Sequence, residues 1–170
     1  AARGVESARE GWRDLPSRYY RLLIVLLVFA LGNSADAFLL LRLSDLGVGA
    51  AFIPMIWALL HVVKAVVSVW GGIKSDRWGR RVVIGAGWLI YALVYAGFAL
   101  STSVAALVAW FLVYGLYYGL SEGTEKALIA DLAPASLRGT AFGIYSAALG
   151  LGSLLASVMF GLVWKIVSPE

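Results

Sequence analysis

Several side chains that can carry charge or donate hydrogen bonds lie inside long apolar stretches of this 170-residue chain. An ionisable side chain in the middle of a lipid-embedded helix is costly, about 2.5 to 3.5 kcal/mol for lysine or aspartate on insertion scales. Such residues are therefore candidates for binding or coupling wherever they occur. The candidates for a cavity that binds a small solute or a proton are Asn33, Asp36, His61, Lys64, Tyr118 and Glu122.

Four of these candidates form two pairs by their spacing. Asn33 and Asp36 are three residues apart, as are His61 and Lys64, so each pair shares a face of a continuous helix. A buried Asp36 would contact solute or take up a proton, whereas an Asp36 near the outer end of the span would simply be solvated. Lys64 would act in coupling, or would form a structural ion pair with Asp36 or with a part of the protein outside this chain.

A third group of polar residues follows along one helix. Glu122 precedes Lys126 by four residues, which is the favourable order for an ion pair within a helix. Tyrosine offers an apolar ring and a hydrogen-bonding tip, so nearby tyrosines suit an amphipathic cavity wall. Packing between helices explains them equally well. The residues concerned are Tyr114, Tyr117, Tyr118 and Ser121.

The composition identifies a membrane protein. Hydrophobic residues make up 61% of the chain and charged residues 14%, whereas soluble domains contain about half and a quarter, respectively. The absence of cysteine and the single histidine exclude disulfides, thiolate metal sites and histidine-rich metal clusters, and we expect no cofactor. The net charge of +4 comes from basic residues between apolar stretches, which argues against a nucleic-acid partner.

Five apolar stretches approach or exceed the roughly 20 residues that a helix needs to cross a bilayer. We therefore predict an all-α, polytopic transmembrane bundle over residues 22–167, preceded by a basic lead-in over residues 1–21. The segment Gly32–Asp36 interrupts the first span. The third span has no charge and is predicted to be the most lipid-exposed. The predicted spans are residues 22–41, 50–73, 82–100, 104–130 and 140–164.

The fifth predicted span is rich in small residues spaced four apart, which allow helices to pack closely in lipid. Three such stripes are present, and we interpret them as packing surfaces. They are Gly139, Gly143 and Ala147; Ala148, Gly152 and Ala156; and Ser153, Ser157 and Gly161.

The segment between the second and third spans carries the most specific pattern. Residues 72–81 read Gly-x-x-x-Asp-Arg-x-Gly-Arg-Arg, and this segment resembles the signature loop of the major facilitator superfamily of membrane transporters. Glycine permits tight turns and close helix approach, aspartate caps a helix or faces a helix N-terminus, and arginine stays charged in water. The six fixed positions are Gly72, Asp76, Arg77, Gly79, Arg80 and Arg81.

The resemblance implies one half of a transporter built from two six-helix halves, each a pair of inverted three-helix repeats. Residues 131–140 are similar to the loop before the eleventh helix of bacterial members, so we expect the C-terminal half without its last helix, with the N-terminal half as partner. The resemblance also implies a cytoplasmic gate between acids of the fourth span and arginines of the signature segment. Its expected members beyond that segment are Glu125, Asp131 and Arg138.

Loop charges predict the orientation, because basic residues accumulate on the cytoplasmic side. Residues 1–21, 74–81 and 131–139 hold most of them and are placed in the cytoplasm, with the protein in the plasma membrane, the inner membrane of a bacterium. The expected function is secondary transport of a small solute by alternating access; a non-transporting membrane scaffold is the alternative. An enzyme is not expected, because the Gly32-Asn33-Ser34-Ala35 segment lacks the final glycine of the intramembrane serine protease motif.

Overall fold

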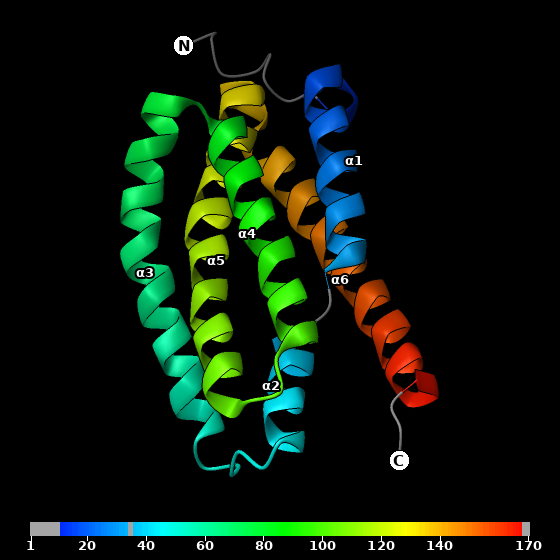
Figure 1. The fold of residues 1–170 in the computed structure, drawn as a ribbon. Coiled ribbons are helices and arrows are strands. Elements are labelled where there is room, and N and C mark those ends of the chain that lie inside the picture. Colours follow the sequence, from blue (N-terminus) through cyan, green and yellow to red (C-terminus); the bar gives the residue numbers. More distant parts are fainter. Residues whose placement is uncertain (1–10, 34–35, 168–170) are drawn as a thin grey trace, which may run out of the picture. The chain divides into compact units, whose positions relative to one another are not determined.

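The described residues, 11–33 and 36–167, are helices joined by short connections, in a computed structural model of the chain (Figure 1). This confirms the predicted all-α class. The elements in chain order are η2 (Trp12–Asp14), α1 (Ser17–Gly32), α2 (Asp36–Asp45), α3 (Ile53–Trp78), α4 (Arg80–Leu100), α5 (Val104–Leu132), η3 (Ala135–Leu137) and α6 (Arg138–Val167).

Four helical segments in the described part of the chain are long and apolar enough to cross a membrane: Ile53–Trp78, Arg80–Leu100, Val104–Leu132 and Ala135–Val163. They coincide with the second to fifth predicted spans. The helices fall into two compact units, which are treated separately below. One unit consists of Ala1–Ala35 with Leu128–Glu170, and the other consists of Asp36–Ala127.

The first predicted span is not one helix. Helix α1 ends at Gly32, Asn33 follows as its C-cap with its N–H donating to the carbonyl of Ala30 at 3.2 Å, and α2 begins at Asp36. Glycine and asparagine are weak helix formers, which explains the stop. Asn33 and Asp36 therefore do not share a helix face, and that prediction is wrong. Ser34 and Ala35 lie outside the described residues.

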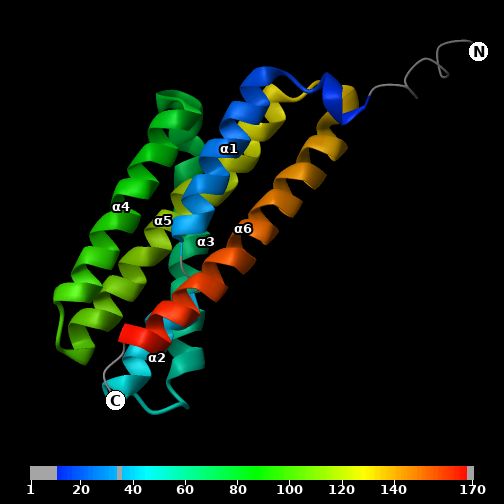
Figure 2. The ribbon, with the colours of Figure 1, turned by 90° about the vertical axis from the view of Figure 1, so that its right-hand side faces the viewer.

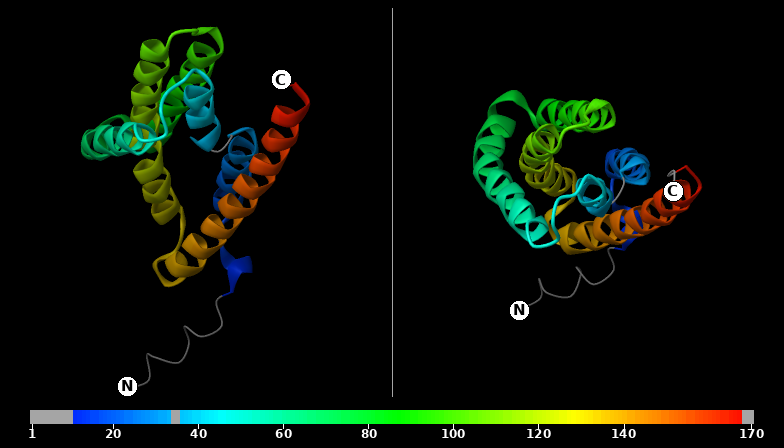
Figure 3. Two further views of the ribbon diagram at one scale, coloured as in Figure 1. Left: turned by 90° about the horizontal axis from the view of Figure 1, so that it is seen from below. Right: turned by 60° about the horizontal axis from the view of Figure 1, so that its bottom comes forward.

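In the unit of residues 36–127, helices α3 and α5 cross at glycine residues, which let the two backbones approach closely (Figures 1 and 3). A Cβ atom on Gly119 would lie 2.6 Å from Cβ of Val67, and one on Gly71 would lie 2.9 Å from the carbonyl oxygen of Gly119. Gly115 faces Val63 in the same way. The spacing Gly115-x-x-x-Gly119 is the packing motif of membrane helices, and our sequence analysis overlooked it.

Helix α4 packs on α5 in the same unit and contacts α3 as well. Gly87 of α4 accommodates Ser121 and Gly97 accommodates the ring of Trp110. Within this chain, 39% of the apolar window of α4 is buried but only 6% of that of α3. Within this chain α4 is thus more buried than α3, and the lipid exposure of residues 82–100 in the whole protein stays a prediction.

In the other unit, α1 lies along α6 (Figure 2). The fully buried hydroxyl of Tyr19 donates a hydrogen bond to the carbonyl of Ala141 at 2.8 Å. A Cβ atom on Gly152 would lie 3.1 Å from Cβ of Ala30, and Ala156 is fully buried. The second predicted stripe of small residues thus includes the surface on which α1 packs. The first stripe is exposed on this chain.

Candidate functional site

Asp36 is held by two tyrosine hydroxyls of another helix. It occupies the first position of α2, and Oδ1 accepts hydrogen bonds from the hydroxyl of Tyr114 at 3.0 Å and from that of Tyr118 at 2.9 Å. The hydroxyl of Tyr118 also lies 3.0 Å from Oδ2. In the part of the chain that the structure describes, these neutral donors are the partners of the carboxylate, and no cation pairs with it.

Tyrosine rings form the surroundings of this carboxylate. Neighbouring rings in the group lie 4.4 to 6.3 Å apart between centroids, mostly in tilted or edge-on arrangements, which aromatic pairs prefer. Only the tips of such rings are polar, so the group is apolar except near the hydroxyls. The members are Tyr91 and Tyr95 of α4 with Tyr114, Tyr117 and Tyr118 of α5. Sequence analysis missed Tyr91 and Tyr95, although their four-residue spacing places them on one helix face.

Lys64 joins the same neighbourhood from α3. Its Nζ lies 2.5 Å from Oε2 of Glu122 and 4.9 Å from the ring centroid of Tyr118. Glu122 also accepts a hydrogen bond from Lys126 at 2.8 Å, which confirms the predicted pair within the helix. The partner of Lys64 is therefore Glu122 and not Asp36. We call Asp36, Lys64, Tyr114, Tyr118 and Glu122 the polar cluster.

His61 lies outside the polar cluster. It is exposed, its Nδ1 lies 2.9 Å from the carbonyl oxygen of Trp57, and its ring stacks on Trp57 at 6.2 Å between centroids. These contacts stay within one turn of α3. Asn33, at the end of α1, belongs to the other compact unit. The structure thus brings together four of the six predicted cavity residues.

The signature segment is a one-residue hinge and not an extended loop. Helix α3 continues to Trp78, α4 starts at Arg80, and Gly79 between them has φ +91°, a conformation that favours glycine. Arg80 donates to Oδ1 of Asp76 and to the hydroxyl of Ser75, both at 2.6 Å. Asp76 does not cap α4, since the N-cap is Gly79 and has no side-chain cap.

The other predicted gate residues differ in their burial and in the compact unit to which they belong. Gly72 has open space beside it, so Gly71 and not Gly72 is the glycine of close approach. Glu125 is a buried acid of α5 with 7% exposure. Arg77, Arg81, Asp131 and Arg138 are exposed on this chain. Asp131 and Arg138 belong to the unit with α6, and their pairing with the signature arginines remains a prediction.

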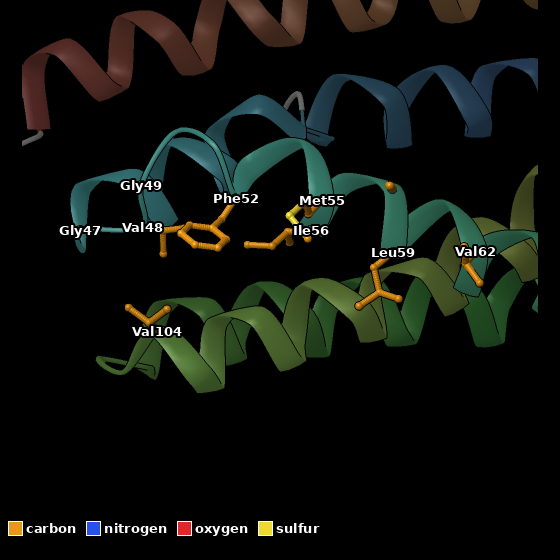
Figure 4. Close-up of a pocket in the computed structure, with 10 residues that line it drawn as sticks. Gly47, Val48, Gly49, Phe52, Met55, Ile56, Leu59, Val62 and Val104 are labelled. Carbon is orange, nitrogen blue, oxygen red and sulfur yellow. The ribbon is translucent and has the colours of Figure 1, made fainter.

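A wide apolar groove of about 860 Å³ opens near the start of α3 (Figure 4). It is lined by residues such as Phe52, Met55, Leu59 and Val104, and it contains none of the predicted cavity residues. A groove without polar groups offers nothing to orient a polar solute. The polar cluster is therefore the candidate functional site. Within the described residues, no group of three or more histidine, cysteine, aspartate or glutamate side chains could hold a metal ion.

Long apolar helices with a charged cluster between them define a polytopic membrane protein of the transporter type. The family comparison agrees, since residues 6–168 match the Major Facilitator Superfamily. The chain belongs to this superfamily of membrane transporters, which are not enzymes.

Three curated relatives illustrate the relationship. An uncharacterised MFS-type transporter of Methanocaldococcus jannaschii is 34% identical over 168 residues, which cover 95% of this chain and 42% of that protein. An uncharacterised protein of Mycobacterium tuberculosis is 26% identical, covering 96% and 39%. The quinolone resistance protein NorA of Staphylococcus aureus is 23% identical, covering 73% and 32%. The chain thus spans about 40% of the length of the first of these relatives.

Proposed function

We propose that this chain forms part of the C-terminal half of a transporter that moves a small solute across the plasma membrane by alternating access. In this mechanism two helical halves rock around a central site, and each half supplies one wall of the cavity. The N-terminal half of the same transporter would supply the opposite wall. The hinge at Gly79 would lie on the cytoplasmic side, as the loop charges predict.

The observation that carries this proposal is the environment of Asp36. Among the described residues, the carboxylate of Asp36 is held by the hydroxyls of Tyr114 and Tyr118 and pairs with no cation, in a surrounding of tyrosine rings. Such a carboxylate can bind a cationic part of a solute. Lys64 and Glu122 are each paired with an opposite charge, so Asp36 is the member available for binding.

The solute is to be identified by experiment, and the relatives suggest a first panel of candidate solutes to test. Quinolones belong in it because the name of one relative refers to quinolone resistance. Sugars and other metabolites complete the panel, since the superfamily resemblance sets no substrate.

The test uses the full transporter that contains this chain, reconstituted in liposomes with a pH-sensitive dye inside. Asp36→Asn should reduce solute flux and any coupled proton movement about ten- to hundredfold, because hydrogen bonds to a charged group contribute roughly 1.5 to 3 kcal/mol. Asp45→Asn is the matched control, since Asp45 is the exposed aspartate at the end of the same helix. Equal flux in both variants would refute the role of Asp36.

The alternative of a membrane scaffold predicts a different result. A scaffold gains little from charged side chains inside its spans, so the triple variant Asp36→Asn, Lys64→Met, Glu122→Gln should keep its partners and its location. Retained solute flux in that variant would show that these three residues do not form the transport site. Absence of flux for every solute in the panel, with the protein correctly folded, would favour the scaffold.

A further inference from the structure

A lysine lies between two tryptophan rings at the end of α3. The Nζ of Lys74 lies 4.6 Å from the ring centroid of Trp78 and 5.3 Å from that of Trp70, four residues away on either side. The two indoles are in edge-on contact at 6.2 Å and are about half exposed, 49% for Trp70 and 57% for Trp78. Tryptophan and lysine side chains of this kind occur at the boundary between hydrocarbon and headgroups.

In the described part of the chain, no acid pairs with the ammonium of Lys74. Among the described residues, its contacts are the two indoles, and the nearest acid in the sequence, Asp76, is paired with Arg80 at 2.6 Å. Arg77, one turn further along α3, and Arg81 are exposed. Residues 74–81 contain four basic residues and one acid, so the local net charge is +3. This end of the α3–α4 pair therefore attracts anions.

An apolar groove of about 400 Å³ leads away from Lys74. Val67 to Trp78 on α3 and Val82 to Ile90 on α4 line it, with Leu116 and Leu120 of α5 at its base. At about 1.5 Å per residue, the α3 side extends for roughly 16 Å, close to half of the roughly 30 Å hydrocarbon core. Lys74 is the one charged residue of this lining and lies about 6 Å from its Trp78 end. The apolar part beyond Lys74 therefore extends for about 10 Å towards Val67, roughly two thirds of one leaflet.

We propose that this groove binds one acyl chain of an anionic phospholipid, whose phosphate is held by Lys74 with support from Arg77. The tryptophan pair would hold the ammonium at the depth of the headgroup, and the groove would take the chain. With the orientation predicted from the loop charges, the lipid belongs to the cytoplasmic leaflet. The inference depends on membrane insertion and not on the proposed transport activity.

Two features favour a lipid over a protein segment as the occupant. A cation without an acid partner among the described residues, next to an apolar groove that extends towards the middle of the membrane, matches a molecule with an anionic head and an aliphatic chain. A transmembrane helix placed there would need its own acid at the depth of Lys74. Anionic headgroups attract each nearby lysine or arginine with an effect equivalent to about fivefold in affinity.

The test measures lipid retention by the detergent-solubilised full transporter, using native mass spectrometry after exchange into phosphatidylglycerol or phosphatidylcholine. Phosphatidylglycerol should be retained preferentially. Lys74→Gln should weaken its retention about fivefold, while Lys74→Arg should preserve it and Lys165→Gln, at the exposed far end of α6, should have no effect. Inorganic phosphate in excess should not displace the lipid, because the acyl chain contributes to binding.

Three outcomes would overturn the proposal. Unchanged phosphatidylglycerol retention in Lys74→Gln would show that Lys74 does not bind the lipid. Displacement by phosphate would reduce the site to a simple anion site. A photoreactive side chain at Val82 that labels another segment of the transporter, and not lipid, would show that protein fills the groove. Each readout is independent of solute flux, so its failure is distinct from failure of the proposed transport function.

Discussion

Asp36 and Asp76 are two aspartates of the same compact unit that satisfy their charge in different ways. The side chain of Asp76 is 66% exposed and pairs with Arg80, one turn away across the Gly79 hinge. Asp36 is partly buried and is held by tyrosine hydroxyls 78 and 82 residues away in the sequence. Near the hinge, a cation one turn away stabilises the carboxylate of Asp76. Inside the spans, the carboxylate of Asp36 is stabilised by hydrogen-bond donors of another helix, so it depends on how the two helices pack.

This difference has energetic consequences. An exposed ion pair contributes about 0 to 1 kcal/mol, since water already stabilises both charges. A polar group away from water loses more when its partner is removed, about 1 to 3 kcal/mol or more for charged groups. We therefore expect the polar cluster to respond to mutation, and to changes in the helix crossing that builds it, more strongly than the hinge does.

The largest effect on stability is expected at the crossing of α3 and α5. Gly119→Val would force side-chain atoms into Val67, which already lies 2.6 Å from the position of an added Cβ. We expect a loss of about 3 kcal/mol in the free energy of unfolding, the upper end for overpacking. Gly123→Val, one turn further on α5, is the control because nothing lies within 4 Å of its Cβ position.

Unfolding of the full transporter by SDS in mixed micelles would measure both variants. Both variants make the same Gly-to-Val change in helix propensity, so the difference in their stability reports the helix crossing. If Gly119→Val and Gly123→Val lose equal stability, the close approach of α3 and α5 is wrong, and with it the geometry that brings Lys64 to Glu122.

A smaller effect is expected at Glu122, which accepts hydrogen bonds from two lysines of unequal exposure. Glu122→Gln would leave Lys64, only 29% exposed, without its acid, and should lower the free energy of unfolding by about 1 to 3 kcal/mol. Lys126→Gln should change it by no more than about 0.5 kcal/mol, because Lys126 is 51% exposed and pairs within one helix.

The double variant Lys64→Met, Glu122→Gln sharpens this test. Removing both members of an ion pair leaves no uncompensated charge and is often far less destabilising than removing one. Stability that is recovered relative to Glu122→Gln alone would assign the loss to the stranded lysine. An additive loss in the double variant would contradict a direct pair.

The contrast between the two aspartates also explains what the sequence could predict. Hydropathy identified four of the helical spans, and the Glu122–Lys126 pair follows from helix spacing alone. The pairing of Asp36 with Tyr118 could not be derived, because it depends on how helices distant in the sequence cross. The Gly115-x-x-x-Gly119 spacing was a readable signal for that crossing. The break after Gly32 was also visible, as a cluster of weak helix formers within an apolar stretch.

The smallest effect on stability is expected at the hinge. Asp76→Asn would weaken the contact with Arg80, but Asp76 is exposed, so the free energy of unfolding should fall by less than about 1 kcal/mol. We also hypothesise that Asp76 holds the outward-facing state by docking on a helix N-terminus, in which case solute flux should slow while the protein remains folded. Flux measured with the Asp36→Asn assay, beside the SDS unfolding of the same preparation, separates these two effects. Unchanged flux would limit the role of Asp76 to its ion pair with Arg80. A loss of stability as large as that of Glu122→Gln would show that the hinge and the polar cluster do not differ in their sensitivity to mutation.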